Sequence, residues 1–230
     1  MRRGMFGVIA AAAASFALSA PTAFAGVGDV WLVDQSFPGG DGSAMHVSAG
    51  GQLDGIFTRG DFDAPNAIEI LPDGRVLVAD GGPGSAGIYQ VDPAGTVSEF
   101  AVNGMLLTPR GIDRAADGTV YMTDSGTDTV YKVNTQTRAI TPFAALPAAS
   151  IVDDVVVARD GTAYATNRGV PRSVLRIGTD GAVTTFATGI LISDPVGIIL
   201  SPDESALFVA DIGSGGLVRV DRATAALSQV

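Results

Sequence analysis

The 230-residue chain contains no cysteine and a single histidine, His46. The absence of cysteine excludes disulfide bridges, thiol nucleophiles, thiolate zinc sites and iron–sulfur clusters. One histidine provides neither an imidazole pair for catalysis nor an imidazole cluster for a metal. Positive charge is also scarce, because 14 Lys and Arg residues stand against 24 Asp and Glu residues, a formal net charge of −10. We therefore expect no nucleic-acid partner, since a phosphate backbone binds surfaces rich in Lys and Arg.

Charged residues make up only 17% of the chain, whereas 47% of it is hydrophobic. Glycine occurs 30 times and proline 12 times. This composition favours many short strands joined by tight turns over long helices or disorder. Lysine occurs once, at position 132, and together with the excess of Ala and Gly this bias indicates a GC-rich bacterial gene.

The first 25 residues have the organisation of a secretory signal peptide. Two arginines at positions 2 and 3 are followed by an Ala-rich apolar stretch and by Ala-Phe-Ala at 23–25, an A-x-A cleavage site. A retained membrane anchor needs about 20 apolar residues without such a small-residue exit. We therefore predict a secreted or periplasmic protein with no membrane span after cleavage.

The rest of the chain repeats with a period of about 43 residues. One series of phenylalanines has this spacing throughout: Phe57, Phe100, Phe143 and Phe186. A second series closes five hydrophobic runs: Asp34, Asp80, Asp124, Asn167 and Asp211. We call the second series the Asp ladder, and we interpret its side chains as caps on their own loops, not as a ring of ligands. The apolar positions and the phenylalanines are expected to form the core.

A complete repeat contains four short apolar runs, the first two separated by a turn such as Asp73-Gly74. Asp-Gly between apolar runs predicts a hairpin whose two central residues both have positive φ. Four antiparallel strands in about 43 residues are typical of a β-propeller blade. We therefore predict an all-β chain in which residues 26–230 form one β-propeller domain. Its five recognisable blades lie at about 27–60, 64–104, 108–146, 150–190 and 194–230.

The strand count leaves two arrangements open. The first blade lacks its innermost strand, and the fifth repeat reaches its fourth strand at Val230. The chain is therefore either a five-bladed ring with an incomplete first blade or an incomplete six-bladed propeller. The second is favoured because an unpaired inner edge invites aggregation. An open ring is expected to associate with itself edge to edge.

The segments 109–124 and 195–211, PRGIDRAADGTVYMTD and PVGIILSPDESALFVAD, resemble NHL-repeat and gluconolactonase-like propellers, the senescence-marker-protein, gluconolactonase and luciferin-regenerating-enzyme superfamily. The resemblance implies a divalent cation, usually calcium, held in the central channel by Asn, Asp and Glu at the starts of the innermost strands. The matching positions here are Asn66, Arg110, Asp153 and Val196.

These positions give the candidate site. The channel ligand is assigned to Arg110, Asn66 and Asp153, and a metal to Asn66, Asp153 and the adjacent Asp154, with Asp63 and Asp194 as supplementary donors. Two oxygen donors of the expected kind are few for calcium, which takes six to eight. Arg110 opposes a cation, favours a carboxylate ligand and is expected to pair with Asp113. No catalytic residue is assigned.

His46 disfavours another branch of the superfamily. Virginiamycin-lyase-like propellers depend on histidine, whereas His46 lies in the third strand of the first repeat and is expected to be an ordinary strand residue. The first hypothesis is an exported scaffold that binds a small molecule or a protein through channel-facing loops. The alternatives are a divalent-metal-dependent lactonase-type hydrolase, with calcium as its cofactor, and a truncated propeller without independent activity.

Overall fold

The computed structural model describes residues 29–34, 42–57, 62–102 and 104–230. All helical or strand structure in these ranges is β-strand. No helix long and apolar enough to span a membrane occurs in them. The predicted signal peptide, residues 1–25, lies outside the described residues.

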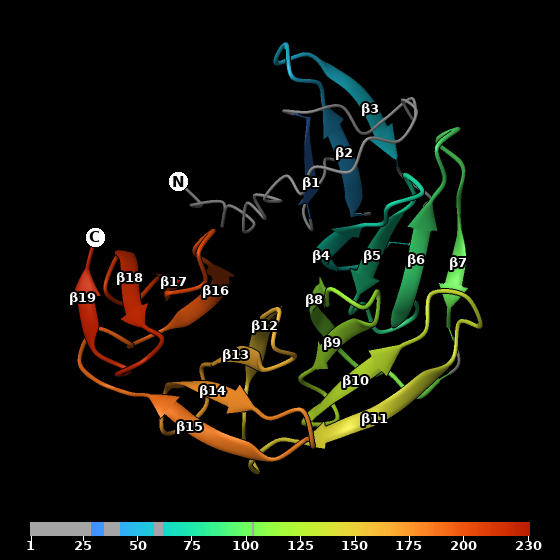
Figure 1. Ribbon diagram of the computed structural model, residues 1–230. Coiled ribbons are helices and arrows are strands. Elements are labelled where there is room, and N and C mark those ends of the chain that lie inside the picture. Colours follow the sequence, from blue (N-terminus) through green and yellow to red (C-terminus); the bar gives the residue numbers. More distant parts are fainter. Residues whose placement is uncertain (1–28, 35–41, 58–61, 103) are drawn as a thin grey trace, which may run out of the picture. The chain divides into compact units, whose positions relative to one another are not determined.

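The strands form five antiparallel sheets, each built from consecutive strands (Figure 1). The first sheet has β1 (Val30–Asp34), β2 (Ser43–Val47) and β3 (Leu53–Phe57). The second has β4 (Pro65–Ile70), β5 (Val76–Asp80), β6 (Gly87–Val91) and β7 (Val97–Ala101). The third has β8 (Pro109–Arg114), β9 (Val120–Asp124), β10 (Thr129–Val133) and β11 (Ile140–Ala145). The fourth has β12 (Val152–Val157), β13 (Ala163–Asn167), β14 (Ser173–Ile177) and β15 (Val183–Ala187). The fifth has β16 (Pro195–Leu200), β17 (Ala206–Asp211), β18 (Gly216–Asp221) and β19 (Leu227–Gln229).

These sheets are the blades of a five-bladed β-propeller, numbered one to five in chain order, and they confirm the predicted fold class. Blade one has three strands, and the packing of β1 identifies the one that is missing from the described residues. β1 contacts β4 of the next blade, just as the second strands β9 and β13 contact β12 and β16. β1 therefore occupies the second position of its blade, and the innermost position is the one without a described strand.

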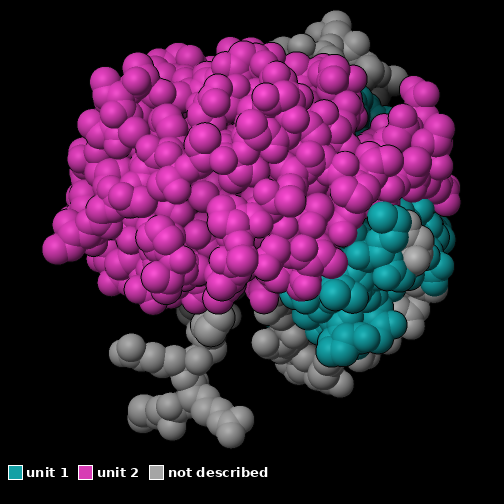
Figure 2. All heavy atoms as spheres, turned by 90° about the horizontal axis from the view of Figure 1, so that it is seen from below, with its two compact units in different colours: residues 1–109 teal, residues 110–230 magenta. Residues whose placement is uncertain are grey.

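The chain divides into two compact units, residues 1–109 and 110–230 (Figure 2). Unit 1 contains blades one and two, and unit 2 contains blades three to five. The one exception is Pro109, the first residue of β8, which belongs to unit 1. Within each unit the blades are held together by side chains between their sheets. A single small sheet has two apolar faces, so it gains stability only by stacking on a neighbour.

Each unit has its own buried core. In unit 1 the core includes Trp31, Phe62 and Tyr89, and in unit 2 one cluster joins blades three and four while another joins blades four and five. Of the repeating phenylalanines only Phe100 is fully buried. The other three are half-buried and lie on an aromatic ring of the blade's second strand, with centroid separations of 5.0 to 5.4 Å, in the pairs Phe57–Trp31, Phe143–Tyr121 and Phe186–Tyr164. The prediction that the phenylalanines form the core is confirmed for Phe100, and the other three pack against the buried core as half-buried side chains.

The Asp-Gly turns form hairpins, but with a different turn from the one predicted. Gly74 has φ of +84°, whereas Asp73 is not left-handed. The N–H of Gly74 donates to the carbonyl of Leu71, and the N–H of Arg75 to the carboxylate of Asp73. The turn therefore has one left-handed position, supplied by glycine, and the carboxylate of Asp73 caps the amide two residues further along the chain.

Candidate functional site

The two ends of a blade differ because neighbouring strands are antiparallel. At one end the innermost strand begins and the second strand returns to the third. We call this the start end. The opposite end carries the Asp-Gly turns, and we call it the turn end. All positions that the sequence assigned to the channel belong to the start end.

The innermost strands contain β-bulges close to their first residue. The register against the second strand shifts at Asn66 in β4, at Asp153 and Asp154 in β12 and at Val196 in β16. A bulge leaves its extra residue unpaired in the ladder and redirects that side chain. The positions matched to the family's ligand positions are therefore irregular places in these three blades.

The Asp ladder organises the loops at this end. The carboxylate of buried Asp80 accepts hydrogen bonds from the N–H groups of Asp63 and Ala64, both at 3.0 Å, and of Gly82 at 2.9 Å. It thereby ties the segment entering β4 to the loop leaving β5. Burial raises the pKa of Asp80, although these hydrogen bonds oppose the rise. Backbone N–H groups also donate to three further members of the ladder: Asp124, Asn167 and Asp211. The interpretation of the ladder as loop caps is confirmed at these four positions.

Four charged side chains form a continuous chain of ion pairs at the start end of unit 2. Arg110 Nη1 lies 3.4 Å from Asp153 Oδ1, and Arg168 Nη1 lies 3.1 Å from Asp153 Oδ2. Arg168 also binds Asp194 with both branches of its guanidinium, at 2.6 and 3.1 Å. We call Arg110, Asp153, Arg168 and Asp194 the charged cluster. Its members come from blades three, four and five.

The two arginines of the charged cluster are paired unequally with its two carboxylates. Burial raises the pKa of Asp153, while Arg110 and Arg168 act against that rise. The bond with Asp194 raises the pKa of Arg168, so this guanidinium is firmly held. Arg110, in contrast, has one ion pair at 3.4 Å, and its Nε is buried without a hydrogen-bond partner among the described residues. One third of its side chain is exposed.

The expected pair between Arg110 and Asp113 is wrong. The carboxylate of Asp113 accepts a hydrogen bond from the N–H of Val157 at 2.6 Å, in the next blade. Burial raises the pKa of Asp113 to about 6. Asp113 therefore satisfies a backbone amide of the neighbouring sheet, and Arg110 turns to Asp153.

The assigned metal ligands are engaged in other contacts. Both carboxylate oxygens of Asp154 accept backbone hydrogen bonds, from Val155 at 2.9 Å and from Ile198 at 3.0 Å. Asp153 faces two guanidinium groups. Asn66 lies in unit 1, where its side-chain N–H donates to the carbonyl of Pro109 at 2.7 Å. In the part of the chain that the structure describes, no group of three or more His, Asp or Glu side chains is placed to hold a metal ion.

Sequence reasoning missed the role of Arg168. It follows the Asp ladder position of blade four, where the other described blades have Gly81, Ser125 and Ile212. The arginine at this position, where the other described repeats have an uncharged residue, is the sequence feature that could have identified it. The sequence indicates Asp194 only as a supplementary metal ligand, whereas in the structure it binds Arg168.

His46 is an ordinary buried strand residue, as predicted. It lies in β2, is 2% exposed, and its ring packs 5.0 Å from that of Trp31. Its Nε2 is 3.3 Å from a carboxylate oxygen of Asp29.

The sequence matches no protein-family model and no curated protein. Solved structures do resemble it. Virginiamycin B lyase from Staphylococcus aureus aligns with a TM-score of 0.71 at 17% identity over 88% of this chain and 66% of the lyase. A chain from the crystal structure of the nidogen/laminin complex aligns with a TM-score of 0.70 at 17% identity, over 88% of this chain and 78% of that one. A Bacteroides fragilis protein assigned as a 6-phosphogluconolactonase aligns with a TM-score of 0.59 at 19% identity over 87% and 66%.

This chain spans just under two thirds of the lyase and of the B. fragilis protein. The likeness confirms, at the level of fold, the resemblance to NHL and gluconolactonase-like propellers. These matches include both binding proteins and enzymes, and at such identities they establish architecture alone. The chain is a β-propeller with the fold shared by streptogramin-type lyases, nidogen and gluconolactonase-like proteins.

Proposed function

We propose that the chain is an exported binding propeller that takes a carboxylate-bearing ligand at the start end of unit 2. The observation that carries this proposal is the unequal pairing within the charged cluster. Each of the three guanidinium nitrogens of Arg168 donates to Asp153 or Asp194. Arg110, in contrast, has a single contact at 3.4 Å and a buried Nε without a hydrogen-bond partner among the described residues.

A carboxylate is the group that this arrangement favours. A guanidinium carries five N–H donors in a planar fork that matches two carboxylate oxygens. Asp153 gives Arg110 only one acceptor oxygen, at 3.4 Å. A ligand carboxylate at the exposed side of Arg110 would supply further acceptor oxygens. Arg168 holds the second oxygen of Asp153, at 3.1 Å, and so prevents Asp153 from turning both oxygens toward Arg110.

The donor set of unit 2 does not fit calcium. Two guanidinium groups face Asp153, and they would repel a cation placed there. Asp154 has both oxygens on backbone amides, so it would have to leave these bonds to ligate a metal. Calcium prefers six to eight oxygen ligands. The lactonase-type hydrolase thus finds less support in this cluster than the binding function does.

Export is part of the proposal. It is supported by the Arg-Arg start, the apolar stretch and the Ala-Phe-Ala site of the first 25 residues. Detection of the chain in the periplasmic or culture fraction, shortened after residue 25, would test it. Retention of the intact chain in the cytoplasm would contradict it.

The binding function is tested by titrating the purified protein with acetate and D-gluconate, following the Nε–H signal of Arg110 by NMR. Arg110→Ala should weaken carboxylate binding at least tenfold, and Arg110→Lys should recover only part of the loss because lysine lacks the fork. The matched control is Arg176→Ala, an exposed arginine on β14. The proposal fails if Arg110→Ala binds as well as the wild type. It also fails if the protein hydrolyses D-glucono-δ-lactone with calcium in a reaction that Asp153→Ala abolishes.

A further inference from the structure

The start end of unit 2 carries exposed aliphatic side chains as well as the charged cluster. Ile190 is 94% exposed, Val170 87%, Ile212 56% and Ile151 48%. Val170 and Ile212 lie in loops between the second and third strands of blades four and five, and Ile151 and Ile190 in segments that lead to an innermost strand. We call these four residues the aliphatic rim.

The aliphatic rim is tied to the charged cluster by backbone hydrogen bonds. The N–H of Arg168 donates to the carbonyl of Ile151 at 2.8 Å, and the N–H of Ile212 donates to the carbonyl of Asp194 at 3.0 Å. Arg168 and Asp194 are themselves joined by their side chains. Val170 follows Arg168 by two residues. Three of the four exposed aliphatic residues, Ile151, Val170 and Ile212, therefore adjoin the charged cluster along the backbone.

The turn end of the same unit is different. Apart from the aliphatic rim, the large hydrophobic residues exposed in residues 110–230 are Ile199, Leu217 and Val230. Two of these lie in strands, and the third is the last residue of the chain. In the described residues of unit 2, the loops of the turn end expose no large hydrophobic side chain. Apolar exposure that concentrates on one end is a mark of an interaction surface.

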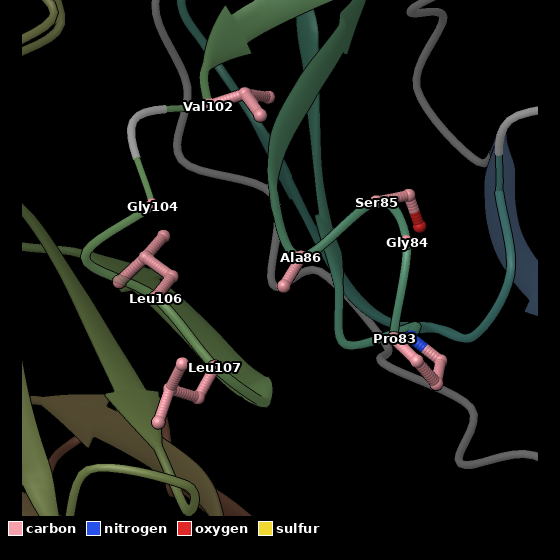
Figure 3. Close-up of a pocket in the computed structure, with 8 residues that line it drawn as sticks. All are labelled: Pro83, Gly84, Ser85, Ala86, Val102, Gly104, Leu106 and Leu107. Atoms are coloured by element: carbon pink, nitrogen blue, oxygen red, sulfur yellow. The ribbon is translucent and has the colours of Figure 1, made fainter.

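The described loops of unit 1 also expose large hydrophobic side chains at their start end. Val102, Met105 and Leu107 are exposed in the segment between β7 and β8. Figure 3 shows Val102, Leu106 and Leu107 on one side of a pocket of about 280 Å³, with the loop 83–86 on the other. Apolar exposure at the start end is therefore a feature of both units.

We propose that the start end of unit 2 binds a segment of another protein in which a carboxylate is flanked by aliphatic side chains. This proposal rests on the carboxylate site described above and names its partner. The carboxylate would bind Arg110, and the flanking side chains would cover the aliphatic rim. Exposed aliphatic side chains beside a guanidinium with one ion pair match such a peptide better than a small free carboxylate, which leaves the rim exposed.

A protein partner also suits the charge of the chain better than a membrane surface does. The formal net charge is −10, and an anionic lipid surface repels such a protein. The two cations of the charged cluster are already paired with Asp153 and Asp194. Arg110 has one ion pair at 3.4 Å and a side chain that is one third exposed, so a single carboxylate suits it better than a charged surface does.

The test is a selection of random heptapeptides on phage against the full chain, with counter-selection on Val170→Ser/Ile190→Ser/Ile212→Ser. Selected peptides should combine aliphatic residues with an Asp, a Glu or a free C-terminal carboxylate. Their affinity, measured by fluorescence polarisation, should fall at least tenfold in the triple variant and in Arg110→Ala. Leu53→Ser is the matched control, because Leu53 is 54% exposed on β3 of unit 1 and should not matter.

Two outcomes would overturn the proposal. One is a selection without enriched peptides, or with peptides that bind the triple variant equally well. The other is flotation of the protein with phosphatidylcholine or phosphatidylserine vesicles in a manner that the triple variant abolishes, since the rim would then contact lipid. Acetate binding distinguishes the peptide proposal from the carboxylate site on which it rests. The triple variant should still bind acetate, because it retains Arg110. If Arg110→Ala leaves acetate binding intact, the carboxylate site itself is wrong.

Discussion

The carboxylate of Asp154 in β12 accepts a hydrogen bond from the N–H of Ile198 in β16, 44 residues further along the chain, at 3.0 Å. Asp113 in β8 does the same for Val157 in β12, again across 44 residues. Both acceptors belong to the innermost strand of one blade, and both donors to the innermost strand of the next. An innermost strand has a partner on one side only, so these carboxylates satisfy N–H groups that the sheet leaves unpaired.

These two carboxylates predict an unusual pH dependence of stability. Burial raises the pKa of Asp154 to about 7 and that of Asp113 to about 6. Between about pH 4 and pH 7 the folded chain therefore holds more protons at these positions than the unfolded chain does. The free energy of unfolding should fall as pH rises, by about 1 kcal/mol per pH unit for each group, up to about pH 6 for Asp113 and about pH 7 for Asp154.

Urea unfolding at about pH 5 and about pH 8 checks this prediction. Asp154→Asn should reduce the difference between the two values, because its side chain does not ionise. Asp203 does not interfere, since its hydrogen bond with Ser201 and those with Ser205 lower its pKa to about 2, below the window. A stability that rises between the two pH values, or an unchanged difference in Asp154→Asn, would contradict the assignment.

The Asp ladder allows a graded test within one position. Asp80→Ala would leave the N–H groups of Asp63, Ala64 and Gly82 without their acceptor. The loss at buried Gly82 alone costs about 1 to 3 kcal/mol. Asp80→Asn should be much milder. Blade four shows why, because Asn167 there serves the N–H groups of Ile151 and Gly169 with its amide oxygen.

Thermal unfolding of both variants measures this difference, and hydrogen exchange of the amides of Asp63 and Ala64 locates it. The asparagine variant should keep these two amides protected, and the alanine variant should not. Equal losses of stability in the two variants would mean that the negative charge of Asp80, not its acceptor oxygens, holds the loop.

The repeats made the fold predictable from the sequence, because a blade is built from local hairpins. The spacing of Phe57, Phe100, Phe143 and Phe186 and the turns between the strands are properties of short segments. The contacts that complete the site are not local. The sequence predicts an ion pair between Arg110 and Asp113 on the same strand. In the structure Asp113 accepts a hydrogen bond from Val157 instead, and that contact depends on the stacking of two blades. The contact between Arg168 and Asp194 depends on stacking in the same way.

Glu204 joins blades four and five at the turn end and has a left-handed backbone, with φ of +56°. Its carboxylate accepts from the N–H of Arg159 at 3.1 Å and pairs with Arg222 at 3.3 Å, and Arg222 also pairs with Asp160. Glu204→Ala should lower the free energy of unfolding by about 1 to 3 kcal/mol through the lost hydrogen bonds to charged groups. Glu204→Gly loses the same bonds but relieves the left-handed strain, and it should be about 1 kcal/mol more stable than the alanine variant.

Chemical unfolding of the two Glu204 variants separates the contribution of the carboxylate from that of the backbone. The other repeats already place glycine at the left-handed position of this turn, as at Gly118 and Gly161. If alanine and glycine at position 204 destabilise equally, the backbone of this turn relaxes when the carboxylate is removed.

Asp153 separates the proposed binding function from the lactonase-type alternative. In the charged cluster it competes with a ligand for Arg110, because its Oδ1 is the acceptor at 3.4 Å. Asp153→Asn removes that competing charge while keeping the size of the side chain, so the affinity for acetate should rise several-fold in the NMR titration. A metal ligand would behave in the opposite way, since loss of a carboxylate weakens calcium binding. A decrease in acetate affinity, or calcium binding that Asp153→Asn abolishes, would therefore favour the hydrolase over the binding propeller.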